Sequence, residues 1–193
     1  TGEMRLKNGA ISVISLPVNL NNIQLYSSIR QDSASIDGAF NSGQGVGRLK
    51  GSFDWKEDPH LALTLKGDSL LIRQAPMITA IVQPDLSLDV YPFKQQLSLK
   101  GTIDVPRARI SMPETTAPVV NISPDVRVVQ QGQDLLATLK AAKPWDIRAD
   151  MTLTLGNQVI FQGFESNIPL VGRLHLSQRG LETAMRANGA IGV

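Results

Sequence analysis

The sequence predicts an all-β protein, and three observations support this fold class. Apolar and polar residues alternate strictly in many short stretches, which is the pattern of strands with one solvated face. The 193 residues include 16 glycines and 11 prolines, as expected for a chain with many turns. Only residues 133–143 are rich in helix formers, and they form either a short helix or a mobile insert. We predict roughly twelve to fourteen short strands, mostly joined by hairpins.

The N-terminal half of the chain contains seven alternating stretches separated by turn signals. Asn8-Gly9, Asp58-Pro59 and Pro84-Asp85 are typical turn dipeptides and lie between such stretches. The predicted strands of this half cover residues 4–6, 11–13, 25–29, 34–36, 47–56, 61–65 and 86–90.

The C-terminal half continues the same pattern on both sides of a loop predicted at residues 112–121. Its predicted strands cover residues 97–105, 147–155, 159–163 and 170–176, with Gly156-Asn157 as a hairpin turn. Because the pattern is the same on both sides of the loop, we predict a single domain over residues 1–193. The chain opens on Thr1 and contains no apolar run near the roughly 18 residues that span a bilayer, so we expect it to be a piece of a longer protein.

The composition excludes most catalytic and metal chemistry. The chain has no cysteine, and its two histidines, His60 and His175, stand apart from any metal-binding motif. The glycine-rich residues 43–48 precede a predicted strand rather than a helix, which argues against a phosphate loop. Asp146 and Asp150 flank Arg148 on the solvated side of a strand and are read as surface charge pairing. We predict no enzyme activity, no catalytic residue, no metal site and no cofactor.

The charge pattern argues against a nucleic-acid partner. The formal net charge is +2, from 19 basic and 17 acidic residues, and no cluster of lysine and arginine is visible along the sequence.

The apolar positions of the predicted strands share one phase. About twenty such side chains expose on the order of 2,000 Å², far more than the few hundred Å² that a soluble monomer leaves uncovered. Either a second sheet covers this face, in a sandwich or barrel, or a ligand with long apolar tails does. The residues of the predicted apolar groove are Leu49, Phe53, Leu61, Leu63, Leu65, Leu86, Leu88, Leu97, Leu99, Ile103, Val105, Ile147, Met151, Leu153, Leu155, Val159, Phe161, Leu174 and Leu176.

Several glycines lie in phase with these apolar side chains. Leu-Lys-Gly occurs three times, ending at Gly51, Gly67 and Gly101, and Gly163 and Gly172 follow the same phase. Glycine inside a strand costs packing and backbone entropy, so its repetition suggests either sharp coiling of the sheet or simple bulges.

Four phrases of the sequence resemble the TamB C-terminal domain family. They are residues 84–88 (PDLSL), 97–110 (LSLKGTIDVPRARI), 153–157 (LTLGN) and 159–164 (VIFQGF). The resemblance covers essentially the whole chain and implies a β-taco, a long antiparallel sheet folded into a U-shaped trough with an apolar interior. The family is similar to the AsmA-like proteins that bridge the periplasm.

The resemblance also implies a function. Members of the family are anchored in the inner membrane, reach a partner named TamA in the outer membrane, and are linked to phospholipid movement and outer-membrane protein assembly. We therefore expect a periplasmic segment whose groove shields phospholipid acyl chains, with the in-phase glycines permitting tight coiling. The alternative is a chaperone-like scaffold that pairs its edge strands with unfolded outer-membrane proteins.

Overall fold

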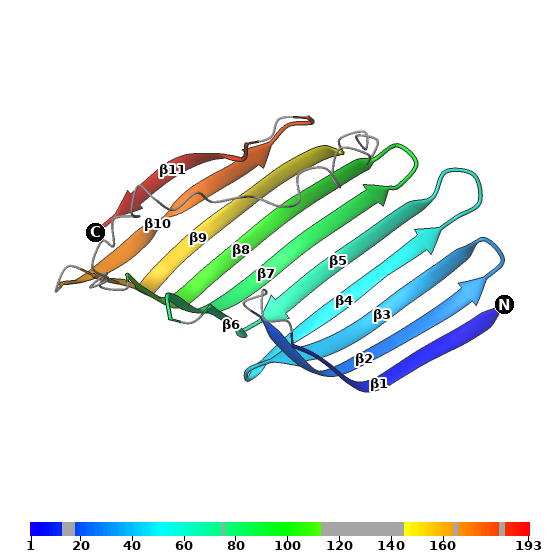
Figure 1. Cartoon of the computed structure of the whole chain (residues 1–193), viewed down its shortest axis with the longest axis horizontal. Coiled ribbons are helices and arrows are strands. Elements are labelled where there is room, and N and C mark those ends of the chain that lie inside the picture. Colours follow the sequence, from blue (N-terminus) through cyan, green and yellow to red (C-terminus); the bar gives the residue numbers. More distant parts are fainter. Residues whose placement is uncertain (13–17, 75, 113–144, 164–165, 182–183) are drawn as a thin grey trace, which may run out of the picture.

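The computed structural model describes residues 1–12, 18–74, 76–112, 145–163, 166–181 and 184–193. These residues form one open sheet of eleven strands, shown in Figure 1. The strands are β1 (Gly2–Ser12), β2 (Asn19–Arg30), β3 (Ser33–Ser42), β4 (Gly45–Asp54), β5 (His60–Asp68), β6 (Leu70–Gln74), β7 (Ile78–Tyr91), β8 (Gln96–Ser111), β9 (Asp146–Gly163), β10 (Ser166–Gln178) and β11 (Arg186–Gly192). The described part contains no helix, so the all-β prediction is confirmed.

The strands follow one another across the sheet in nearly sequential order. The path runs β1-β2-β3-β4-β5-β7-β8-β9-β10-β11, and β6 pairs with β7 beside it. All neighbours are antiparallel except β8 and β9, which run parallel. No second sheet packs on the first within the described ranges, so the sandwich and the closed barrel are not the arrangement found there. The predicted loop at 112–121 falls outside the described residues beyond Met112, as does the helix candidate at 133–143.

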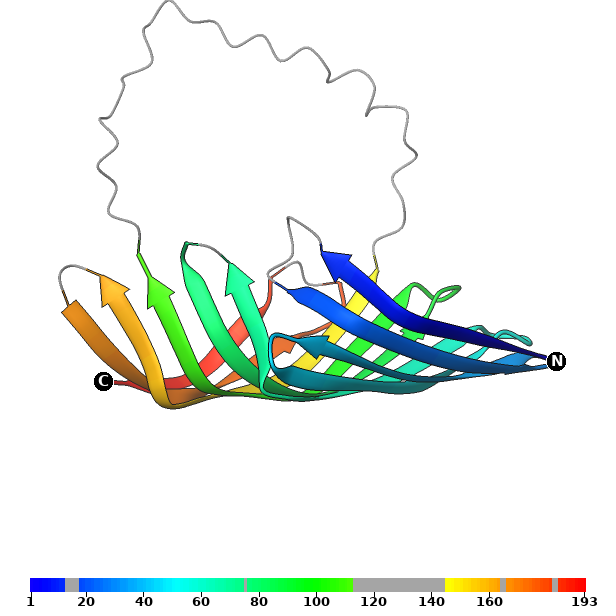
Figure 2. The same ribbon diagram turned by 90° about the horizontal axis from the view of Figure 1, so that it is seen from below.

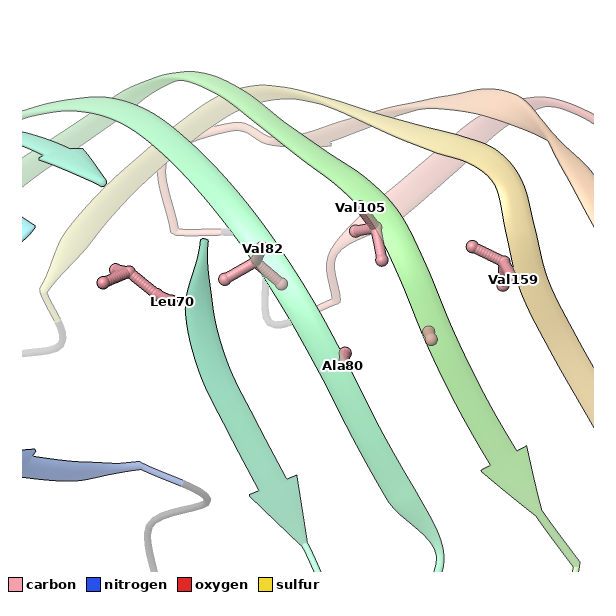
Figure 3. Packing of buried hydrophobic residues seen from close by; sticks show 6 residues of the cluster. Leu70, Ala80, Val82, Val105 and Val159 are labelled. Atoms are coloured by element: carbon pink, nitrogen blue, oxygen red, sulfur yellow. The ribbon is translucent and has the colours of Figure 1, made fainter. Parts of the chain in front are cut away.

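The sheet is bent, and its two faces differ. Strands β7, β8 and β9 curve toward one side along their length (Figure 2). The side chains of Val82, Val105 and Val159 lie on the inner side of this bend (Figure 3). We call the face that carries them the inner face and the opposite one the outer face.

A small core lies at the bend on the inner face. Its members come from β6, β7, β8 and β9, and Val159 is completely buried. The cluster consists of Leu70, Ala80, Val82, Val105, Ala108 and Val159. A single layer of strands leaves few positions covered on all sides, so most other apolar side chains are only half-buried.

The turn predicted at Asn8-Gly9 is wrong, because β1 continues through it. Asn8 has a φ of 56°, and the register of β1 on β2 shifts on both sides of Gly9. Asparagine tolerates this left-handed backbone, which serves a bulge inside a strand as well as a hairpin turn.

The turn predicted at Pro84-Asp85 is also wrong, since both residues lie inside β7. This strand changes its partner here: residues 78–82 pair with β6, and residues 85–90 pair with β5. Pro84 has no partner in β5 or β6, so a residue without a backbone N–H is tolerated between these two ladders, while on its other side it pairs with Ile103 of β8.

The third failed turn, Gly156-Asn157, lies inside the 18-residue strand β9. A Cβ on Gly156 would stand 2.9 Å from the Cα of Pro106 on β8, so glycine is needed where the two strands approach. The three dipeptides lie inside strands and do not end them. For this reason the strands are longer and fewer than predicted.

Pro106 marks a bulge that reverses the phase of β8. The register of β8 on β9 shifts between Val105 and Arg107. Val105 and Ala108 are both buried, whereas Arg107 between them is exposed. The inner-face positions therefore change from odd to even numbers at this bulge.

Candidate apolar binding face

The strand registers place all nineteen predicted groove residues on the inner face. Directly paired residues in neighbouring strands share a face, so each register row can be followed across the sheet. One row crosses six strands and consists of Leu49, Leu65, Leu86, Gly101, Met151 and Leu176. A second consists of Phe53, Leu61, Val90, Leu97 and Ile147, and a third of Gly51, Leu63, Leu88, Leu99 and Ala149.

The remaining predicted residues form shorter rows near the bend. These rows are Ile103, Leu153 and Leu174, then Val105, Leu155 and Gly172, then Ala108, Val159 and Leu170, and finally Ile110, Phe161 and Ile168. None of these rows contains a charged residue. Among the predicted residues, Val105, Met151 and Val159 are buried and the others are half-buried.

The structure extends this face to residues that the sequence reasoning missed. Leu25 pairs with Gly38, which pairs with Leu49, so the first row continues onto β3 and β2. Leu70 and Val82 pair with each other and belong to the buried cluster. In the missed part of β7, the three successive apolar residues 80–82 break the alternation, so period two did not mark it.

The five predicted glycines all share the phase of the inner face, and Gly101 shows why a side chain is not accommodated. Its φ is 140°, and a Cβ there would stand 2.0 Å from the carbonyl oxygen of Asp85 on β7. Gly51 leaves similarly little room, because a Cβ would stand 2.1 Å from the carbonyl oxygen of Ala62 on β5. These glycines permit close approach of neighbouring backbones.

The outer face carries the charged residues, many of them in ion pairs. Lys66 Nζ lies 2.9 Å from Asp85 Oδ2, and Arg148 lies 3.0 Å from Asp146. The predicted surface pairing around Arg148 is therefore confirmed for Asp146, whereas Asp150 lies beside His175 instead. The contrast between the two faces is that expected of a sheet with one wet side.

Each of the two histidines lies beside one aspartate. His175 is exposed, with its Nδ1 3.7 Å from Asp150 Oδ1. His60 opens β5, where its Nε2 lies 3.0 Å from Asp89 Oδ1 and its ring stacks on Tyr91 at 4.3 Å. Within the described ranges, no group of three histidine, cysteine or acidic residues is placed to hold a metal ion.

The same end of the sheet carries a charge-assisted contact next to His60. Lys94 donates a hydrogen bond to the Asp58 carboxylate, and this contact raises the pKa of the Lys94 ammonium. Both side chains are well exposed, so the contact stabilises the β7–β8 end only weakly.

The predicted exclusion of a phosphate loop agrees with the fold, because residues 43–48 lead into β4 and no helix follows. In the described part of the chain there is also no helix long and apolar enough to cross a membrane.

Two comparisons relate the chain to known proteins. The family model described as TamB C-terminal domain matches residues 33–193. The translocation and assembly module subunit TamB of Haemophilus influenzae (strain ATCC 51907 / DSM 11121 / KW20 / Rd) is 24% identical over 190 residues, a match that covers 92% of this chain. This chain spans only 14% of the length of that relative. No solved structure matches the chain.

Proposed function

The chain belongs to the TamB C-terminal domain family, and from this premise we propose that its inner face shields phospholipid acyl chains during transport between two membranes. Membership in the family suggests a role in a translocation and assembly module, and the name of the relative, a module subunit, implies a partner protein. The members of this family act in assembly or transport and not as enzymes.

The observation that carries the proposal is the continuous apolar inner face. Its rows cross β4 to β10 without a charged side chain, and most of its members are half-buried. Exposure of such a face to water is unfavourable in free energy. Acyl chains can cover it without any specific polar contact. In this proposal the bent sheet forms a U-shaped trough, and the glycines in phase with the rows permit its coiling.

The proposal also includes the extent of the domain, its location in the cell and its partner protein. We propose that residues 1–193 act as one domain, because their described strands form one hydrogen-bonded sheet. The whole protein would lie in the periplasm, anchored in the inner membrane, and act with TamA in the outer membrane.

Photo-crosslinking tests whether lipid lies on the inner face. A photoreactive residue at Leu99 or Leu153 should give phospholipid adducts in cells. Their sequence neighbours Lys100 and Thr154 lie on the outer face, where they pair with Asp150 and Asp104, and should give none. Absence of adducts from Leu99 and Leu153, together with no lipid in a solvent extract of the purified protein, would contradict the proposal.

Charge placed on the inner face should block transport. Leu99→Glu or Ile103→Arg puts an unpaired charge among half-buried apolar side chains, where acyl chains would have to pass it. We expect lost lipid transport at a normal level of protein. The matched controls Lys100→Glu and Thr102→Arg change the outer face and should transport lipid normally.

A second candidate function, a scaffold for unfolded outer-membrane proteins, is favoured by the two edges of the sheet. β1 and β11 each pair with one neighbour only among the described strands, and every residue of β11 is exposed. A client strand could add to such an edge by main-chain hydrogen bonds. Ala190→Pro in β11 should abolish client crosslinking and leave the lipid adducts of Leu99 unchanged; the reverse pattern would contradict this candidate.

A further inference from the structure

Three arginines from two strands meet on the outer face, next to the bend. The register aligns Arg73 of β6, Thr79 of β7 and Arg109 of β8 in one row. Arg107 lies two residues before Arg109 on the same side of β8. With strands about 4.8 Å apart and a rise of about 3.4 Å per residue, the three backbone positions lie within about 12 Å of one another.

The bulge of β8 is what brings two of these arginines to the outer face. Without the phase change at Pro106, the odd-numbered Arg107 and Arg109 would continue the inner-face row of Ile103 and Val105. The sequence showed no cluster of basic residues, because Arg73 is far from the other two along the chain.

The arginines line a hollow whose described lining contains no acidic side chain. A cavity of about 610 Å³ is lined by Arg73, Thr79, Arg107, Arg109, Gln158 and Ile160, among others. A neighbouring cavity of about 620 Å³ shares Ile81, Arg107 and Gln158 with it. Among the described residues that line the two cavities there is no aspartate or glutamate.

Within the part of the chain that the structure describes, no carboxylate neutralises these arginines. Over the described ranges, no ion pair joins Arg73, Arg107 or Arg109 to a carboxylate, whereas Lys66 and Arg148 elsewhere on the outer face are paired. Arg107 Nε donates a 2.9 Å hydrogen bond to Gln158 Oε1, which orients its guanidinium without cancelling its charge. Converging guanidinium groups suit phosphate oxygens, which accept two parallel N–H bonds from each.

The hollow lies close to a rim of the sheet where the opposite face is apolar. Arg73 is one residue from the end of β6, and Arg109 is two residues from the end of β8. On the inner face, Ile78, Ile110 and Phe161 form the row nearest this rim. A molecule that reaches over the rim would meet cationic groups outside and apolar groups inside.

We propose that Arg73, Arg107 and Arg109 bind the phosphate of an anionic phospholipid whose acyl chains reach the inner face over this rim. The inference deepens the proposed function and rests on it for the position of the chains. The anion site itself depends only on the arginines and can be tested separately.

Vesicle binding tests the site. The chain should cosediment with vesicles of equimolar phosphatidylcholine and phosphatidylglycerol more than with phosphatidylcholine alone. Replacing all three arginines by glutamine should weaken binding to the mixed vesicles about a hundredfold, since each cation near an anionic surface contributes about fivefold. The charge-matched control Arg48→Gln, Lys100→Gln and Arg173→Gln removes three outer-face cations elsewhere and should lose much less. Circular dichroism checks that both variants keep their β structure.

Four outcomes would overturn the proposal. Equal losses of vesicle binding in the two triple variants would mean that binding depends on the net charge of the protein and not on a site. Equally tight binding of the soluble headgroup glycerophosphoglycerol, or of inorganic phosphate, would assign the site to a free phosphate. Equal competition by a single-stranded oligonucleotide would indicate a surface for any polyanion. Unchanged vesicle binding by the arginine variant would remove the site altogether, whereas missing lipid adducts at Leu99 would count against the proposed function alone.

Discussion

At the scale of single residues, Gly101 combines two constraints on its side chain. Its φ of 140° lies in a region that side chains rarely adopt, and the space for a Cβ is taken by the carbonyl oxygen of Asp85. We expect Gly101→Ala to lower the free energy of unfolding by roughly 1–3 kcal/mol. Urea unfolding measures this change, and Gly2→Ala is the control, because nothing lies within 4 Å of a Cβ there. Equal midpoints for the two variants would contradict the strained backbone.

Val159 is a second residue whose environment sets a clear expectation. Its side chain is 0% exposed at the centre of the buried cluster, so Val159→Ala leaves a cavity that a single layer of strands fills poorly. We expect a loss of about 2 kcal/mol in the free energy of unfolding. Val171→Ala, at a position 44% exposed on β10, should change it by less than about 0.5 kcal/mol. A similar small loss at Val159 would mean that the cluster contributes little to stability.

At the scale of elements, the pairing of β8 with β9 is the feature that alternation did not predict. Hairpins join antiparallel strands, but β8 and β9 run parallel, as strands joined by a long connection can. The parallel register pairs Thr102 with Thr152, and the register shift between Val105 and Arg107 then places Arg107 opposite Gln158 on the outer face.

Disulfide trapping tests this register in a chain that has no cysteine of its own. Thr102→Cys with Thr152→Cys places the two thiols on directly paired residues, within the Cα separation of about 4.4–6.8 Å that a disulfide requires. We expect rapid crosslinking under mild oxidation, seen as a mobility change on a non-reducing gel. Thr102→Cys with Thr154→Cys, displaced by two residues, should crosslink far more slowly. The opposite order would mean a different register.

At the scale of the whole molecule, the sheet has one layer and one apolar side. Such a molecule should bind the fluorescent dye ANS in its native state, unlike a protein whose apolar residues fill a closed core. A fatty acid should displace the dye if acyl chains cover the same face. Leu99→Glu should reduce native dye binding, and the outer-face control Lys100→Glu should not. A native protein without dye binding would mean that the face is covered.

The sequence by itself determined which side chains share a face. Alternation is a local property of an extended chain, and it assigned all nineteen groove residues to the inner face before any partner strand was known. The all-β class follows from the same local pattern.

Only the tertiary structure decided which strands meet and where the phase changes. Asn8-Gly9, Pro84-Asp85 and Gly156-Asn157 have the residues of turns, but neighbouring strands hold each of them inside a longer strand. The same backbone freedom serves a turn or a bulge, and the choice depends on long-range pairing that no short window contains. For that reason the parallel β8–β9 pair, the bulge at Pro106 and the meeting of Arg73 with Arg107 and Arg109 became visible only once the sheet was assembled.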